Sequence, residues 1–225
     1  MYQQYSKMGT RVNYKINKIP ELKLYKNKII TNPTGEKESG VPYQYNDFGY
    51  RSTNSYSELL NRGYNIVCIG SSFTFGLGVE YEDIWPNKLS NLMKKEVINL
   101  GWPGGSHKYI IWQLLNVLNN VQTENIFVEI PPKGRTLDLT EKYFENDNNL
   151  EGYNQNRTEF ILNEADNDDL LLKSLCKANN VNYIECYEFG EPWETKWLPL
   201  AKDGGHFGPK WHEFIANHFY KKIQK

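Results

Sequence analysis

Three side chains of the types used in nucleophilic catalysis stand at two separate places in this sequence. Asp203 and His206 are three residues apart in Asp-Gly-Gly-His, and Ser72 lies far upstream, directly after a strongly apolar run and Gly70-Ser71. A serine hydroxyl becomes an effective nucleophile when an imidazole accepts its proton and a carboxylate orients that imidazole. The two intervening glycines let the chain turn back, so that the carboxylate can reach the ring. Together the two segments predict a split Ser/His/Asp hydrolase.

Each half also has a structural interpretation. Ser72 could cap a helix that follows a strand, and His206 could be a surface histidine. His212 and His218 are six residues apart on a predicted helix and face different directions, so we expect structural roles for both. The chain has no second His or Cys at the spacing of metal ligands, and we therefore expect no metal site.

Four short apolar segments predict strands, with helical patterns between them. The strands are Ile66–Ile69, Val97–Leu100, Ile126–Ile130 and Val181–Tyr187; the helices are Asp83–Lys95 with Asp83 as its cap, a run capped by Ser106, Asp168–Asn180, and a last helix from Pro209 through Ile223. Such alternation predicts a parallel sheet with right-handed crossovers. Ligands bind such sheets at the carboxyl ends of the strands, where Ser72 and the Asp203–His206 loop are expected to meet.

We expect one α/β domain over residues 63–225. Residues 1–62 show no clear hydrophobic periodicity and contain several prolines and glycines. This pattern predicts an irregular arm, with one or two strands, that packs on the core. Residues 133–166 are polar and rich in asparagine, which predicts an insertion or mobile loop.

Composition excludes several classes of partner. The net charge is -1 with mixed signs throughout, so no basic surface is expected to hold nucleic acid. No apolar run is long enough for a membrane span, and the first residues lack the apolar core of a signal peptide. Three cysteines in apolar segments predict buried thiols in a reducing compartment. We therefore expect a cytoplasmic or virus-encoded intracellular protein.

Three segments resemble sequence blocks of the SGNH (GDSL-type) hydrolase family. Ile69–Gly76 resembles block one, Asn99–Ser106 block two and Asp203–His206 block five, within about residues 64–220, and Tyr45–Arg51 more weakly resembles a segment that precedes block one. The resemblance implies a flavodoxin-like three-layer fold with a short parallel sheet between helices, and ester hydrolysis without a cofactor. It implies Ser72 as the nucleophile, His206 as the base and Asp203 as the orienting carboxylate. The backbone N–H groups of Ser72 and Gly104 would form the oxyanion hole.

The chain departs from the family pattern at two places. Ser71 stands where family members usually have an aspartate that is more structural than chemical, so we expect serine to be tolerated there. The segment Pro131–Arg135 lacks the asparagine that the third block normally contributes to the oxyanion hole, and losing such a donor costs on the order of 10²- to 10³-fold in rate. Either Lys133, Arg135, Ser106 or His107 substitutes, or the enzyme is slow, or catalysis has been lost.

The predicted function is hydrolysis of a small acyl ester through an acyl-enzyme on Ser72, with an O-acetylated carbohydrate as the leading substrate. Several other residues have two interpretations. Trp102, Trp193 and Trp197 could stack on sugar rings or pack internally, and His107 could contact substrate or face solvent. Lys133 and Arg135 could bind an acyl or anionic group or form a solvated turn. Two alternatives remain: a binding or structural protein that keeps the fold without turnover, and an acyltransferase that uses the same triad. The sequence does not determine the oligomeric state.

Overall fold

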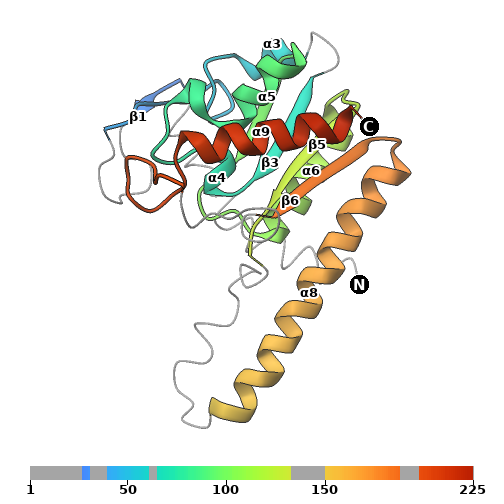
Figure 1. The fold of residues 1–225 in the computed structure, drawn as a ribbon. Coiled ribbons are helices and arrows are strands. Elements are labelled where there is room, and N and C mark those ends of the chain that lie inside the picture. Colours follow the sequence, from blue (N-terminus) through green and yellow to red (C-terminus); the bar gives the residue numbers. More distant parts are fainter. Residues whose placement is uncertain (1–26, 31–39, 61–64, 133–149, 188–197, 225) are drawn as a thin grey trace.

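A four-stranded parallel sheet lies at the centre of the computed structural model (Figure 1), which describes residues 27–30, 40–60, 65–132, 150–187 and 198–224. Its strands are β3 (Ile66–Gly70), β4 (Val97–Gly101), β5 (Asn125–Ile130) and β6 (Asn182–Tyr187), each at a predicted position. Every residue of β3, β4 and β5 is buried, as short continuous apolar runs predict for strands covered on both faces. Strand β6 forms one edge and is largely half-exposed.

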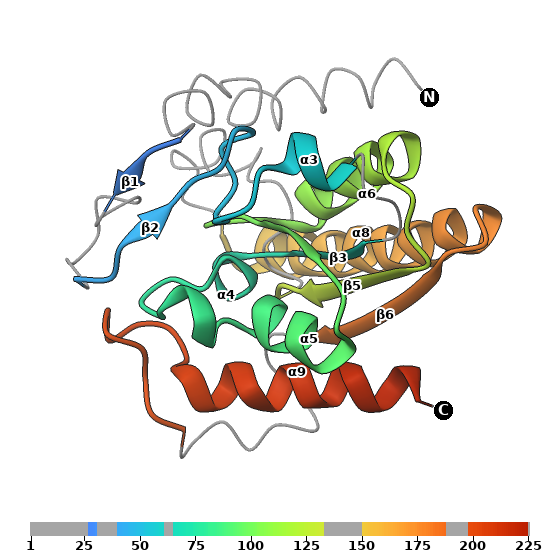
Figure 2. The same cartoon turned by 90° about the horizontal axis from the view of Figure 1, so that it is seen from above.

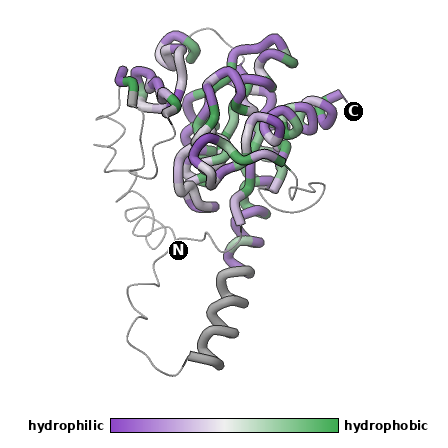
Figure 3. The backbone as a smooth tube through the Cα atoms, turned by 60° about the vertical axis from the view of Figure 1, so that its left-hand side comes forward, coloured by the Kyte–Doolittle hydropathy of each residue, from purple (hydrophilic) through white to green (hydrophobic). Residues whose placement is uncertain are grey.

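Helices cover both faces of the sheet, which gives three layers (Figure 2). Helices α5 (Trp85–Met93) and α9 (Pro209–Ile223) lie on one face, and α6 (His107–Asn120) and α8 (Leu150–Ala178) lie on the other. Alternate side chains of β3 enter the two cores: Ile66 and Cys68 face α5 and α9, whereas Val67 and Ile69 face α6. Figure 3 shows hydrophobic segments gathered in this layered body.

The order of the strands confirms the predicted fold class. Across the sheet the order is β4-β3-β5-β6, so the second strand in the chain lies outside the first and the third lies on its other side. This is the start of the flavodoxin-like doubly wound order. The chain leaves β3 toward α5 on one face and leaves β5 toward α8 on the other. The carboxyl ends of β3 and β5 therefore flank the crevice where ligands bind in such folds.

Two of the four predicted helix starts, Ser106 and Pro209, are confirmed. Ser106 caps α6, with its hydroxyl accepting from the N–H of Tyr109 at 3.3 Å, and Pro209 lies in the first turn of α9. Asp83 is not a cap, because it belongs to the 3₁₀ turn η1 (Tyr81–Asp83) and its carboxylate pairs with Lys88 at 2.8 Å. The first N–H of α5 instead donates to a side chain of α9.

Helix α8 begins at Leu150, well before the predicted Asp168. The second part of the predicted insertion, from residue 150 onward, is therefore helical, and residues 133–149 lie outside the described residues. Figure 1 shows the first half of α8 extending past the sheet. The residues before Asp168 are mostly polar in sequence, so hydrophobic periodicity did not predict this part of the helix.

The described part of the segment before β3 packs on the core, with Tyr43 beside Phe75 just after β3 and Leu59 bonded to Asn65 just before it. Strands β1 (Ile29–Ile30) and β2 (Tyr43–Gln44) form an antiparallel ribbon, and α3 (Tyr56–Leu60) is a short helix that the sequence did not predict. The rings of Tyr43 and Tyr45 are buried against Phe75. The three cysteines are buried free thiols, as predicted. Among the described helices, none has the length and apolarity needed to cross a bilayer.

Candidate active site

The residue proposed as nucleophile stands in a short, enclosed turn at the end of β3. Ser71 has an extended backbone and caps α4 (Ser72–Phe75), its hydroxyl accepting from the N–H of Phe73 at 3.4 Å. Gly76 ends this helix with a left-handed backbone, φ 82°, and its N–H donates to the carbonyl of Ser72 at 2.8 Å. Ser72 is 4% exposed. Both ends of its turn are therefore fixed by backbone geometry.

The predicted base lies in a loop that is folded on itself before α9. The N–H of Ala201 donates to the carbonyl of His206 at 2.8 Å, which closes the loop at its base. Gly204 adopts φ 72°, a conformation that a residue with a Cβ rarely takes. One oxygen of Asp203, Oδ1, accepts from the N–H groups of Gly205 and His206 at 3.0 and 3.1 Å. The turn that the two glycines predicted is present.

The fold brings the three predicted side chains into one line of hydrogen bonds. Ser72 Oγ lies 2.9 Å from His206 Nε2, although 134 residues separate the two in sequence. His206 Nδ1 lies 2.7 Å from Asp203 Oδ2. The ring of Phe73 packs on the imidazole with its centroid 5.0 Å away, which restricts how the ring can turn. Ser72, His206 and Asp203 therefore have the arrangement that proton transfer from the hydroxyl requires.

Local hydrogen bonds keep the Asp203 carboxylate ionised. Burial opposes the charge, but donation from the N–H groups of Gly205 and His206 and from the His206 ring outweighs it, and the pKa of Asp203 lies below its ordinary value. An ionised Asp203 accepts a hydrogen bond from the Nδ1–H group, so the neutral imidazole carries its hydrogen on Nδ1. His206 Nε2 is then an acceptor that faces the Ser72 hydroxyl.

The two predicted oxyanion donors lie in neighbouring loops. Gly104 is in the exposed loop between β4 and α6, with φ 74°, and the N–H of Trp102 in that loop donates to the carbonyl of Gly70 at 3.1 Å. Among the residues that the structure describes, none accepts a hydrogen bond from the N–H of Ser72 or Gly104. An oxyanion-hole role would require N–H groups without an acceptor in the protein, and this condition is met among these residues.

The remaining predicted contact residues have four different outcomes. His107 is 0% exposed and its Nε2 lies 3.7 Å from Asp169 Oδ1 on α8, so it neither faces solvent nor borders a substrate space. Both interpretations of His107 were wrong, because its partner comes from a distant helix. Trp102 is partly exposed and contacts Phe75 edge-on, with ring centroids 6.4 Å apart. Ser106 is the α6 cap. The other candidates lie outside the described residues: Lys133, Arg135, Trp193 and Trp197.

Sequence reasoning missed a carboxylate beneath the nucleophile turn. Glu129 of β5 is 0% exposed, and its Oε2 accepts from the N–H of Ser71 at 2.7 Å and from Thr74 Oγ1 at 2.9 Å. Its Oε1 lies 3.2 Å from Ser71 Oγ. A charged residue inside an otherwise apolar strand was the available signal, because carboxylates are rarely buried without hydrogen-bonded partners.

Arg51 was also missed as a functional residue. Its side chain is buried, and its guanidinium donates to the carbonyls of Phe75, Gly76 and Val79, the residues that follow Ser72. The guanidinium carbon lies 4.6 Å from the centroid of the Tyr43 ring. Burial lowers the pKa of Arg51 to about 10, which leaves it charged at neutral pH. The weaker resemblance over Tyr45–Arg51 was the only signal for it.

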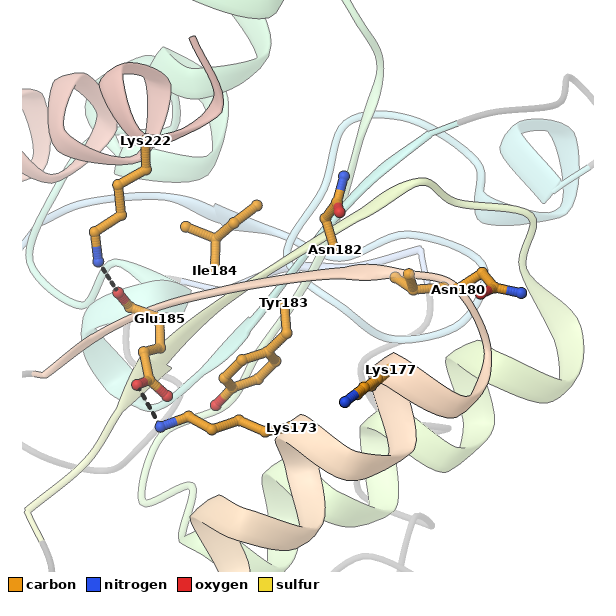
Figure 4. A pocket seen from close by; sticks show the side chains of 9 residues that line it. Lys173, Lys177, Asn180, Asn182, Tyr183, Ile184, Glu185 and Lys222 are labelled. Atoms are coloured by element: carbon orange, nitrogen blue, oxygen red, sulfur yellow. Dashed lines mark hydrogen bonds and ion pairs between the residues drawn. The ribbon is translucent and has the colours of Figure 1, made fainter. Parts of the chain in front are cut away.

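A separate open depression of about 820 Å³ lies along edge strand β6, between α8 and α9 (Figure 4), and contains none of the predicted site residues. Lys173 pairs with the Glu185 carboxylate at 2.7 Å, and Lys222 donates to the Glu185 carbonyl at 2.8 Å. These lysines belong to α8 and α9 and reach over the edge strand, and charges placed along a sheet edge discourage pairing with other chains. The depression is therefore better explained as a protected sheet edge than as a ligand site.

Comparisons with known proteins give similarity to solved structures alone: no family model matches the chain, and no curated protein does. The chain is similar to a protein assigned to the lipolytic G-D-S-L family from Desulfitobacterium hafniense DCB-2, at 14% identity over 71% of this chain and 99% of that one, with a TM-score of 0.42. It is similar to a member of the same family from Veillonella parvula DSM 2008, at 15% identity over 72% and 97%, with a TM-score of 0.41. A two-domain esterase active on acetylated mannans is 13% identical over 75% of this chain and 52% of that one, with a TM-score of 0.39. These values are too low to carry an activity from those proteins to this chain.

Proposed function

We propose that this protein is a serine ester hydrolase of the SGNH type that acts on a small acyl ester. One observation carries the proposal: the unbroken line of hydrogen bonds from Ser72 through His206 to Asp203. Ser72 is not the helix cap that the alternative interpretation suggested, because Ser71 caps α4. His206 is also not an ordinary surface histidine, because its ring is largely enclosed between Phe73 and the Asp203 turn.

The first half of the reaction forms an acyl-enzyme. Ser72 Oγ attacks the ester carbonyl carbon while His206 Nε2 takes the hydroxyl proton, and the Asp203 carboxylate stabilises the imidazolium that results. The negative charge on the carbonyl oxygen accepts hydrogen bonds from the N–H groups of Ser72 and Gly104. When the intermediate collapses, the bond from carbonyl carbon to alkoxy oxygen breaks, and His206 returns the proton to the departing alcohol.

The second half reverses these roles with water. His206 removes a proton from water as the water oxygen attacks the acyl carbon, and the Ser72 ester bond breaks as Oγ regains the proton. The products are the free acid and the original enzyme. An acyltransferase would follow the same steps with another alcohol in place of water, and the two reactions would then differ only in the acceptor.

For the substrate we propose an O-acetylated carbohydrate. Trp102 is partly exposed and stands two residues before Gly104, so a ring stacked on it would lie beside the proposed oxyanion hole. Its edge-on contact with Phe75 holds the indole in place. A small acetyl group suits a nucleophile that is 4% exposed, because little room surrounds the hydroxyl.

The test is the turnover of p-nitrophenyl acetate by wild type, Ser72→Ala and Ser174→Ala, the last being an exposed serine of α8 that serves as the matched control. We expect wild type and the control to be equally active and Ser72→Ala to fall to background. Equal background rates for all three would remove the ester-hydrolase proposal for short acyl groups and favour a binding role. Adding an alcohol acceptor and measuring the transferred acetyl group separates hydrolysis from transfer.

A further inference from the structure

Glu129 connects the two sides of the nucleophile turn. Its Oε2 accepts from the N–H of Ser71, which precedes the nucleophile, and from the hydroxyl of Thr74, which follows it. Its other oxygen contacts the Ser71 hydroxyl, which also caps α4. One carboxylate thus fixes the residues on both sides of Ser72, and any rotation of the turn must break one of these bonds.

The carboxylate is itself held rigidly. β5 pairs directly with β3, with Ile69 opposite Val128, so Glu129 starts from a fixed position beside the end of β3. A Cβ built on Gly70 would lie 2.5 Å from Glu129 Oε2 and 2.1 Å from Thr74 Oγ1. Only glycine therefore fits between the carboxylate and the turn. This close packing transmits the position of β5 to the backbone of Ser71.

We propose that Glu129 is a positioning residue for the nucleophile: it supplies, from the neighbouring strand, the carboxylate that orders the turn carrying Ser72. The inference rests on the proposed function, because the direction of the Ser72 hydroxyl affects a rate only if that hydroxyl reacts. Position 71 itself holds a serine, whose N–H and hydroxyl both contact Glu129. The carboxylate thus reaches the turn from the adjacent strand, β5.

The chemistry explains why a carboxylate suits this place. Two hydroxyls and one backbone N–H surround it, and hydrogen bonds to a charged acceptor are about twice as strong as neutral ones. Ser72 Oγ must stay near 2.9 Å from His206 Nε2. A displacement of about 1 Å at a reacting group can cost on the order of 100-fold in rate. Losing the carboxylate should therefore reduce the reactivity of Ser72 even though Glu129 contacts no substrate.

The experiment measures the rate at which a fluorophosphonate probe labels Ser72 in folded variants. Glu129→Gln keeps the volume of the side chain and removes its charge. The amide oxygen can still accept from Ser71 and Thr74, and the amide nitrogen can donate to the Ser71 hydroxyl. We expect the labelling rate to fall by about 10-fold. Glu129→Ala loses every bond, and we expect a loss of about 100-fold. For ester turnover the same losses should fall on kcat with KM nearly unchanged.

Moving the carboxylate distinguishes positioning from a purely structural role. Ser71→Asp alone would bury two carboxylates together and should slow labelling strongly. In the double variant with Glu129→Gln, the turn keeps a single carboxylate, now at position 71, and the new amide at position 129 can donate to it. We expect the double variant to be labelled about 10-fold faster than Ser71→Asp alone, because one charge-assisted acceptor is restored. A structural role would predict only a further loss of melting temperature.

Asp168→Asn is the matched control, since Asp168 is a buried carboxylate that bonds Lys108 on the other face of the sheet. It should lower the melting temperature and leave the labelling rate unchanged. If Glu129→Ala is folded and is labelled at the wild-type rate, the inference is overturned and the proposed function stands. If Glu129→Ala does not fold, faster labelling of the double variant than of Ser71→Asp supports the inference, and equal labelling overturns it. Failure of wild type to be labelled would overturn both.

Discussion

The nucleophile turn and the histidine loop are joined by the hydrogen bond between Ser72 and His206, yet they are held in different ways. The turn is buried, and side chains from other elements reach it: Glu129 from β5, Asn99 from β4 and Arg51 from the segment before α3. The loop before α9 is half-exposed, and its own backbone and the Asp203 carboxylate supply most of its hydrogen bonds; the N–H of Lys202 adds one to the carbonyl of Gly78 at 3.0 Å.

This difference separates stability from reactivity. Buried polar groups lose their partners when a long-range contact is removed, so changes around the nucleophile turn should reduce folding stability and rate together. A loop closed by local bonds can lose one side chain and keep its shape. Changes in the histidine loop should therefore reduce the rate with little effect on stability. Each expectation can be tested by measuring both quantities for the same variant.

The largest rate effect is expected for Asp203→Asn. An amide at this position no longer holds the proton on His206 Nδ1 or stabilises the imidazolium, and the analogous change in a serine protease costs about 10⁴-fold. The amide oxygen can still accept from the N–H groups of Gly205 and His206, so the melting temperature should change little. Asp83→Asn, at a carboxylate of similar local type, should leave turnover unchanged. A large fall in stability with Asp203→Asn would contradict the description of this loop as self-contained.

The opposite signature is expected for Arg51→Met. It leaves the carbonyls of Phe75, Gly76 and Val79 without their donor, and each unsatisfied buried group costs about 1–3 kcal/mol. We expect the free energy of unfolding to fall by about 3 kcal/mol or more, and the rate of the folded protein to fall as well. Arg51→Lys keeps the positive charge but lacks the planar guanidinium, so its free energy of unfolding should lie between those of wild type and Arg51→Met. Denaturant unfolding measures these losses, and an unchanged midpoint for Arg51→Met would refute the assignment.

Gly78→Ala tests the contact between the two regions. A Cβ at Gly78 would lie 2.7 Å from Asp203 Cγ and 2.8 Å from Ala201 Cβ, so the histidine loop must move. We expect turnover to fall by about 100-fold, the cost of a displacement of about 1 Å. Gly40→Ala is the matched control: Gly40 has φ 70°, close to the 72° of Gly78, with no described atom near its Cβ. Equal effects of the two substitutions on turnover would show that the loop does not depend on this contact.

At neutral pH the smallest effect is expected from His212, whose contribution to stability changes only as the pH falls. This ring is buried, and its Nδ1 accepts from the N–H of Trp85, the first residue of α5, at 3.1 Å. Burial, helped by the positive charges of Arg51 and Lys88, lowers the pKa of His212 to about 3, against 6.5 for an ordinary histidine. The unfolded chain therefore binds this proton first, and stability present above about pH 6.5 is lost progressively as the pH falls toward 3.

His212→Asn keeps an acceptor for the Trp85 N–H and removes the titration. Between about pH 6.5 and 3, its stability should therefore fall less than that of wild type. Thermal or urea unfolding across this range gives the two slopes. Parallel slopes would show that His212 does not contribute to the acid sensitivity.

Local signals in the sequence were enough to predict the sheet and the three aligned side chains. The four strands are short, apolar and end in glycine or proline turns, and the Asp203–His206 turn is encoded by its own glycines. The same is true of the Ser106 cap, whose partner is three residues away. Features of this kind depend on neighbours in sequence, which pattern reasoning can read.

The meeting of Ser72 and His206, 134 residues apart, was predicted from the types of these residues and from the family resemblance, but other contacts between distant residues were missed. His107 was expected near solvent or substrate, but Asp169 on α8 lies beside it in the fold. Asp83 was expected to cap α5, but His212 of α9 takes the first N–H. Glu129 was not singled out within the predicted strand, because its contacts with Ser71 exist only after β3 and β5 pair.

The most direct test of the central claim is to react the folded protein with a fluorophosphonate probe and to locate the modified residue by mass spectrometry. The wild-type chain should carry the label on Ser72, and His206→Ala should lose it while keeping its melting temperature. Labelling that is absent from Ser72, or that persists undiminished in His206→Ala, would contradict the claim that the imidazole activates this hydroxyl.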